Sequence, residues 1–204
     1  MNGKREIKEN LRGLLAPVVA LLEYLGATPM GVTLAGLAIS FVGAAFTGAG
    51  RLVAGAIMLV VSGLCDTLDG SLARSGGRVT RFGAFLDSSG DRVTEMAYFG
   101  ALVYYFSFGP HASGVMVVFT LTALAGSFLT SYARARAEGL GLECRVGLLE
   151  RPERVVILVA GLLFGHRALS VVIVVLALLS TFTFIQRVLH VRNITLRGDT
   201  PAGP

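Results

Sequence analysis

Four aspartates within the most apolar part of this chain constrain its fold more than any other feature. They follow the pattern Asp66-x2-Asp69-Gly70-x2-Ala73-Arg74-x8-Gly83-x3-Asp87-x3-Asp91. A carboxylate at the centre of a membrane span costs roughly 2.5–3.5 kcal/mol on insertion scales. Four such groups therefore need a compensating partner or ligand.

The spacing of these aspartates arranges them in two pairs. On helices, Asp66 and Asp69 are an i,i+3 pair, and Asp87 and Asp91 are an i,i+4 pair, so each pair shares one helix face. Two facing helices would bring the four carboxylates around one point. Hard divalent cations take oxygen ligands, and Mg²⁺ in particular binds through carboxylates together with substrate phosphates. The pattern thus suggests a divalent-metal site.

The composition is that of an all-α integral membrane protein with several spans. Of 204 residues, 53% are hydrophobic and only 15% are charged. An amphipathic helix over residues 4–23 is expected to lie in the membrane interface, because its apolar positions recur every three to four residues. Six transmembrane stretches follow, of which the fifth is short. They are placed near 31–49, 51–73, 82–108, 113–137, 152–165 and 168–192.

Residues 1–196 are expected to form a single membrane domain, and residues 197–204 a disordered tail. No short apolar segment with a small-residue cleavage site follows the polar start, so no signal peptide is predicted. The two cysteines, Cys65 and Cys144, fall in or beside regions placed toward the cytoplasm. Both are predicted to be free thiols.

The distribution of basic residues predicts the orientation. With an N-in, six-span layout, all of the 18 lysines and arginines except Arg51 and Arg167 lie on or near one side. By the positive-inside rule, both termini and the aspartate motif then face the cytoplasm across the cell membrane. The net charge of +5 is explained by orientation and by anionic lipid headgroups, without a nucleic-acid partner.

The aspartate motif resembles the signature of the CDP-alcohol phosphotransferases, D-x2-D-G-x2-A-R-x8-G-x3-D-x3-D, and every defined position is present. Members of this family transfer a phosphatidyl-type group from a CDP-linked lipid to an alcohol and release CMP. The resemblance implies a homodimer of six-helix protomers with a polar cavity open to the cytoplasm. The six stretches and the amphipathic start agree with it over nearly the whole chain.

The resemblance also implies roles for the four aspartates. Asp66, Asp69 and Asp87 would be the main ligands of Mg²⁺ or Mn²⁺, with two ions about 4 Å apart neutralising the pyrophosphate. Asp91 would be the base that deprotonates the acceptor hydroxyl, while also touching a metal. Because Asp91 lies one turn beyond Asp87, it can extend past the metal toward an acceptor.

A CDP-lipid site is implied around the same motif. Gly70 would let the nucleotide approach the backbone, Arg74 would hold phosphate or ribose, and Gly83 would let the two motif helices pack closely. Met30 stands where the family often has Asp or Asn, so one polar nucleotide contact is missing. The residues assigned to this site are Pro29, Thr33, Asp66, Asp69, Gly70, Ala73, Arg74 and Gly83. Pro29 and Thr33 could equally serve only to start a helix.

Three other readings of the motif remain open. The acids could be ion-paired structural residues, or they could line the cation pathway of an ion-coupled transporter. A prenyl-transfer enzyme with aspartate-rich metal motifs is a further option. None of these classes requires Gly70, Ala73 and Arg74 at their fixed offsets from the acids.

A second set of residues concerns the acceptor. Arg forks bind phosphate bidentately, and Arg is weakly enough hydrated to work in a partly buried pocket. Arginines near the cavity therefore indicate a phosphorylated acceptor, which free serine or free glycerol would not require. The candidate acceptor-phosphate residues are Arg134, Arg136, Arg151, Arg154 and Arg187, to which the resemblance to one branch of the family adds Ser131. The alternative is that these arginines only fix the orientation of the protein in the membrane and contact lipid headgroups.

The second segment resembles the phosphatidylinositol-phosphate synthase branch of the family. The resemblance rests on Ser-Tyr-x2-Ala-Arg-Ala-Glu from Ser131, on Gly-Leu-x-Glu-Arg-Pro-Glu-Arg from Gly147, and on Gln186-Arg187. Arg134 replaces the usual Lys. The expected reaction transfers the group from CDP-diacylglycerol to inositol phosphate. Glycerol phosphate is the main alternative acceptor, and CDP-archaeol or a soluble CDP-inositol are alternative donors.

Overall fold

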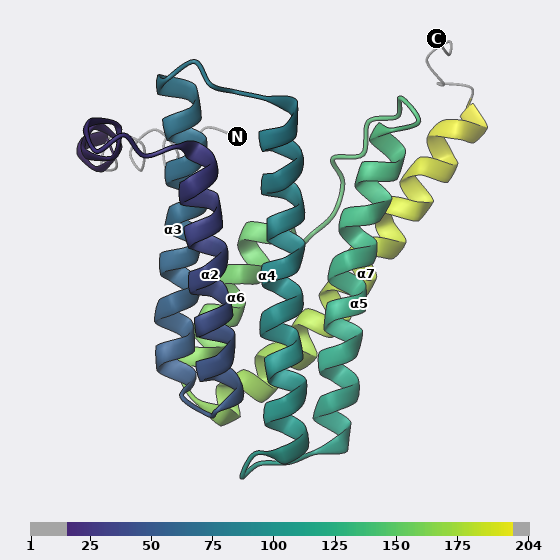
Figure 1. The fold of residues 1–204 in the computed structure, drawn as a ribbon. Helices are drawn as coiled ribbons and strands as arrows, with labels where there is room; N and C mark the ends of the chain where they lie inside the picture. The colour runs from purple at the N-terminus through teal and green to yellow at the C-terminus, as the bar shows by residue number, and fades with distance from the viewer. Residues whose placement is uncertain (1–15, 198–204) are drawn as a thin grey trace.

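The computed structural model describes residues 16–197 of the chain, and within this range every regular element is a helix (Figure 1). Residues 16–24 form a short helix that lies crosswise to the others. Six longer helices follow: α2 (Pro29–Gly48), α3 (Leu52–Ser75), α4 (Arg81–Phe108), α5 (Gly114–Glu138), α6 (Arg151–Leu163) and α7 (His166–Arg197).

The bounds of the six long helices match those of the six predicted apolar stretches to within a few residues, apart from the end of α7. Local capping explains several starts. Thr28 caps α2 by accepting from the Gly31 amide, with Pro29 in the first turn, and Thr80 caps α4 by accepting from the Gly83 amide. One boundary was wrong. α7 continues to Arg197 instead of ending near residue 192, because no glycine or proline interrupts it before residue 198. Residues 198–204 and 4–15 lie outside the described range.

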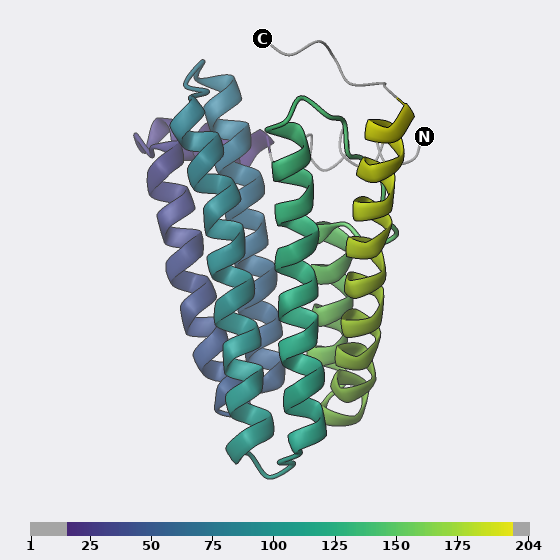
Figure 2. The same cartoon turned by 90° about the vertical axis from the view of Figure 1, so that its right-hand side faces the viewer.

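The six long helices close into a ring. The neighbouring pairs are α2 with α3, α3 with α6, α6 with α7, α7 with α5, α5 with α4 and α4 with α2. Figure 2 shows α2, α4, α5 and α7 side by side, with α3 and α6 behind them. α3 and α4, which carry the aspartate motif, are therefore not neighbours in the ring.

The short helix α6 begins part-way down the bundle. An irregular segment, residues 142–150, runs down from the end of α5 to reach it (Figure 1). α6 has only 13 residues, too few to cross a bilayer of about 30 Å. Its first residue, Arg151, is thus delivered to the interior rather than to the end of the bundle.

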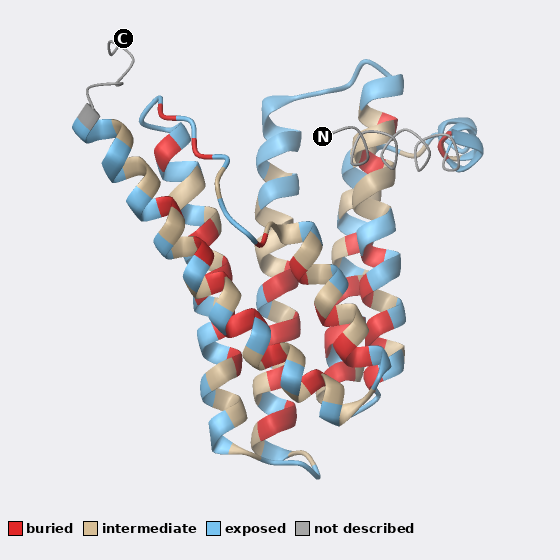
Figure 3. Cartoon of the chain, turned by 180° about the vertical axis from the view of Figure 1, so that it is seen from behind, coloured by how far each residue is buried: buried red, intermediate tan, exposed pale blue. Residues whose placement is uncertain are grey.

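The apolar core occupies the half of the bundle remote from the described N-terminal end, while the nearer ends of α3 and α4 are more exposed (Figure 3). Tyr98, Leu102, Phe106, Leu162 and Ile173 are almost fully buried there. This core holds the helices together below the aspartates, so the polar site lies in the open half.

Small residues let α2 pack closely against α3 and α4 in this core. The Tyr98 hydroxyl donates to the Gly55 carbonyl at 2.8 Å, and a side chain at Gly43 would overlap that hydroxyl. Close approach at small residues is the usual basis of helix packing in membranes. Tyr98 lies two turns from Asp91 on α4, so this contact fixes the position of the aspartate-bearing part of α4 along the bundle.

Within the described residues, four helices are long and apolar enough to cross a membrane: α2, α3, α5 and α7. Both cysteines are free, as predicted. The short helix 16–24 is linked to the end of α3, because the Ser75 hydroxyl donates to Glu23 at 2.5 Å.

Candidate metal and phosphate site

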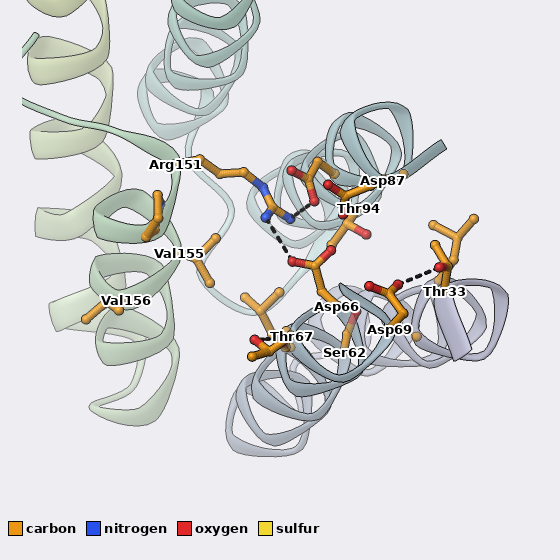
Figure 4. A pocket seen from close by; sticks show the side chains of 17 residues that line it. Thr33, Ser62, Asp66, Thr67, Asp69, Asp87, Thr94, Arg151, Val155 and Val156 are labelled. Carbon is orange, nitrogen blue, oxygen red and sulfur yellow. Dashed lines mark hydrogen bonds and ion pairs between the residues drawn. The ribbon is translucent and has the colours of Figure 1, made fainter. Parts of the chain in front are cut away.

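Three carboxylates from two helices meet at the centre of the site. Asp66 comes from α3, and Asp87 and Asp91 come from α4; one carboxylate oxygen of each lies within 4.8 Å of the others. We call these three residues the triad. Figure 4 shows Asp66 and Asp87 facing each other across the space between the helices. The i,i+4 spacing on α4 places both of its acids on this side.

The fourth predicted ligand, Asp69, lies beside the triad rather than in it. Its carboxylate accepts a hydrogen bond of 2.5 Å from the Thr33 hydroxyl of α2 (Figure 4), and only 6% of the residue is exposed. Thr33 therefore holds Asp69 in place from a third helix.

Two adjoining cavities surround these acids. One, of about 400 Å³, extends toward α6 and includes Arg151. The other, of about 690 Å³, lies between the starts of α2 and α4 and the end of α3. Both are bordered by Thr33, Asp66, Thr67, Asp69 and Asp87. The acids thus form the boundary between two compartments.

The second cavity contains every residue that the sequence assigned to the CDP-lipid. All eight, from Pro29 and Thr33 to Arg74 and Gly83, line it. The Arg74 guanidinium lies over Gly70, where an added Cβ would come within 3.2 Å of Nη1. Met30 also lines this cavity, so an apolar side chain occupies the position where a polar contact was expected.

The role predicted for Gly83 was wrong. A Cβ added there would meet only the Thr80 hydroxyl, at 3.0 Å, and no atom of α3. The two motif helices are separated by the cavity instead of packing closely, because α4 packs against α2 and α5. Gly83 lies in the first turn of α4, where its amide donates to the Thr80 cap.

Arg151 is the cation nearest the triad among the described residues. Its Nη2 lies 2.6 Å from Asp91 Oδ1, and its Nη1 lies 3.8 Å from Asp66 Oδ2 (Figure 4). One turn further along α6, Arg154 is buried and donates to Glu95 from Nε at 3.3 Å and from Nη2 at 3.0 Å. The two arginines thus pair with two acids that are also one turn apart, on α4.

The remaining predicted acceptor residues lie on α5 and α7, outside the two cavities. Arg187 is buried and donates to the Thr130 carbonyl at 2.7 Å and to the Val146 carbonyl at 2.9 Å. Arg134, partly exposed, pairs with Glu138 at 2.8 Å. Arg187 lies close enough to Arg134 and Arg154 for their like charges to repel one another, and we call these three residues the basic region.

Two predicted acceptor residues are less closely tied to this region. Ser131 is partly exposed one turn before Arg134. Arg136 is exposed and lies two positions beyond Arg134, which turns it to another face of α5. The structure therefore does not bring Arg136 together with the other arginines.

Sequence reasoning missed Glu95. It is buried, and its second oxygen accepts from the Ser127 hydroxyl at 2.7 Å, so it joins α4, α5 and α6. A signal was present, because Asp87, Asp91 and Glu95 continue one i,i+4 series. The partner, Arg154, could not be read from that spacing.

The triad fits a hard divalent cation. Its donors are carboxylate oxygens, with neither nitrogen nor sulfur among them, which is the set preferred by Mg²⁺ and Mn²⁺. With Asp69 beside the triad and Arg151 paired with Asp91, the site combines an oxygen-rich cation site with a group that can bind phosphate.

Comparisons with known proteins agree with this chemistry. The chain is 41% identical over 165 residues to archaetidylinositol phosphate synthase of Methanothermobacter thermautotrophicus, covering 78% of this chain and 80% of that protein. It is 39% identical over 192 residues to phosphatidylinositol phosphate synthase of Mycobacteroides abscessus, covering 91% and 87% respectively.

Solved structures give the same picture. The crystal structure of Mycobacterium tuberculosis phosphatidylinositol phosphate synthase with CDP-DAG bound matches with a TM-score of 0.81 and 38% identity, over 86% of this chain and 92% of that one. The same enzyme in complex with manganese and citrate matches with a TM-score of 0.80 at 38% identity, over 86% and 87% of the two chains. The family model for CDP-alcohol phosphatidyltransferase matches residues 27–184. This chain therefore belongs to the CDP-alcohol phosphatidyltransferase family.

Proposed function

We propose that this protein transfers the phosphatidyl group of CDP-diacylglycerol to a hydroxyl of inositol phosphate and releases CMP. The observation that carries the proposal is the second cavity: all eight residues assigned to the CDP-lipid line it, and so do two triad residues, Asp66 and Asp87. The names of the relatives, and the CDP-DAG bound to the M. tuberculosis enzyme, support the same substrates.

The proposed roles follow from position. Asp66, Asp87 and Asp91, with Asp69 beside them, would hold one or two Mg²⁺ or Mn²⁺ ions. When bound, these cations would neutralise the charge that develops on the pyrophosphate. Asp69 is oriented by Thr33, which restricts its carboxylate to one arrangement.

The transfer itself requires a base and an acceptor in line with the leaving group. We assign the base to Asp91, which borders the first cavity. The acceptor oxygen bonds to the phosphorus that carries the lipid, the bond from that phosphorus to the CMP oxygen breaks, and the acceptor proton passes to Asp91. CMP leaves with its phosphate. Arg74, over Gly70, would contact the nucleotide phosphate or ribose.

The acceptor phosphate would be bound by arginines rather than by the metal ligands. We assign it to the basic region of Arg134, Arg154 and Arg187, together with Arg151, and retain Ser131 and Arg136 as weaker candidates. The alternative acceptor, glycerol phosphate, presents the same anionic group, so the polyol itself must be distinguished by assay.

The membrane arrangement is part of the proposal. α4 and α6 would complete six membrane-embedded helices over a single domain of residues 1–196. The crosswise helix at 16–24 would lie in the interface near anionic headgroups, with both termini and the open half of the bundle facing the cytoplasm. The family resemblance further suggests a homodimer, and mass measurement in detergent would test it.

A direct assay measures CMP release by the purified protein in lipid nanodiscs. With CDP-diacylglycerol fixed, we expect turnover with inositol phosphate and none with inositol or serine. Turnover with glycerol phosphate and none with inositol phosphate would show that glycerol phosphate is the acceptor. A second series with CDP-archaeol tests the donor, because the archaeal relative is 41% identical. Asp87→Asn is the control variant and is expected to be inactive. Activity equal to that of the wild type in this variant would reject the proposed site.

A further inference from the structure

Arg151 pairs with two of the carboxylates that a bound cation would also use. Its guanidinium lies 2.6 Å from Asp91 Oδ1 and 3.8 Å from Asp66 Oδ2, and both acids belong to the triad. Figure 4 shows the side chain reaching from α6 across the cavity to α3 and α4. The positive charge of the side chain offsets part of the charge of the three carboxylates.

This contact competes with metal binding for two reasons. A charge-assisted hydrogen bond of this length occupies a lone pair of the Asp91 oxygen, which is then not available to a cation. A divalent cation and the guanidinium would also repel each other at this distance, because both are positive and the Arg151 and Asp91 side chains are only 27% and 15% exposed. Cation binding at the triad therefore weakens the contact between Arg151 and Asp91.

The structure leaves Arg151 free to respond, while the helix that carries it is held. Arg154, one turn along α6, is 4% exposed and donates to Glu95 and to the Leu149 carbonyl. By contrast, the buried Nε of Arg151 has no hydrogen-bond partner, and its contact with Asp66 is long. The Arg151 side chain can thus swing while its backbone stays in place.

We propose that Arg151 is the internal counter-ion of the triad, which yields to the divalent cation and is thereby turned toward a substrate phosphate. The inference rests on the proposed function for the identity of that phosphate. It makes cation binding and phosphate binding cooperative, because the cation frees the guanidinium that the phosphate uses. Arg151 lines the first cavity and not the second, so an acceptor phosphate fits better than the donor pyrophosphate.

The first test measures Mn²⁺ binding to the full-length protein in detergent without substrate, by the electron paramagnetic resonance signal of free Mn²⁺. We expect Arg151→Gln to bind Mn²⁺ about 10-fold more tightly or better, since one charge-assisted hydrogen bond no longer competes. Arg151→Lys, which keeps the charge but loses the fork, should lie between the two. An unchanged affinity in Arg151→Gln would overturn the inference.

Arg145→Gln is the matched control. It removes the same charge from an exposed pair with Glu143, whose side chains are 77% and 74% exposed, away from the triad. An equal gain in this variant would mean that net charge, and not competition at the triad, governs Mn²⁺ affinity, and would overturn the inference. Absence of Mn²⁺ binding in the wild type would reject the metal site of the proposed function as well.

The second test measures cooperativity. Titration calorimetry should show that Mn²⁺ raises the affinity of the wild type for inositol phosphate, and that this gain is largely lost in Arg151→Gln. A parallel titration with CDP-diacylglycerol distinguishes the two phosphate sources. The inference is overturned if Mn²⁺ raises the affinity for inositol phosphate by the same factor in Arg151→Gln as in the wild type. It is also overturned if the effect of Mn²⁺ on CDP-diacylglycerol affinity is as large as its effect on inositol phosphate affinity.

Discussion

Breaking the buried pair between Glu95 and Arg154 should destabilise the protein strongly. The side chains are only 7% and 5% exposed, with Nη2 at 3.0 Å from Oε1. Glu95→Gln keeps an oxygen that can accept from Ser127 but leaves the guanidinium of Arg154 without its counter-ion.

The expected magnitude follows from that uncompensated charge. Removing one partner of a buried ion pair costs about 3–5 kcal/mol, because the other charge stays desolvated. For a chain of this size, about 2–4 °C of Tm accompanies each kcal/mol, which predicts a fall in Tm of about 6–20 °C. The double variant Glu95→Gln with Arg154→Met removes both charges and should recover most of this loss.

Thermal unfolding of the detergent-solubilised variants measures these shifts. Glu143→Gln is the control, because its pair with Arg145 is exposed and should shift Tm by no more than about 2–4 °C. Two results would refute the reasoning: a Tm of Glu95→Gln equal to the wild type, or a double variant no more stable than Glu95→Gln. Either would mean that Arg154 finds water or another partner.

Three further predictions concern catalysis and packing. Asp91→Asn should lose turnover while retaining CDP-lipid binding, because Asp91 is the proposed base. Single-turnover rates and nucleotide affinity test this prediction, and loss of both would make Asp91 an essential metal ligand. Arg187→Ala should raise the KM for the acceptor by roughly 10- to 150-fold and the donor KM little, as steady-state kinetics would show; equal rises would indicate that its bonds to the 142–150 segment are its main role. Gly43→Val should lower Tm by about 2–12 °C, since overpacking costs about 1–3 kcal/mol where the new side chain meets Tyr98; an unchanged Tm would mean that α2 shifts freely.

Much of the architecture could be predicted from the sequence because its signals are local. Apolar stretches bounded by glycine pairs and by Gly109-Pro110 gave helix boundaries that the structure confirms. The structure places the motif residues from Pro29 to Gly83 around one cavity. Both results depend on spacing along single helices and on a specific motif, which do not require knowledge of how helices pack.

The arrangement between helices depended on the tertiary structure. Periodicity shows which residues share a face, as for Asp87 and Asp91, but not the depth or rotation of one helix relative to another. It therefore could not show that α3 and α4 stand apart, or that Thr33 holds Asp69 beside the triad.

The arginines illustrate the same limit. From the sequence, Arg151, Arg154 and Arg187 appear equivalent, as basic residues near the cytoplasmic side. The irregular 142–150 segment starts α6 inside the bundle, and this placement gives each a different partner: Asp91, Glu95 and backbone carbonyls. The sequence by itself determined which helices form and which acids share a face. Packing decided which charges meet, because buried charges must find partners in three dimensions.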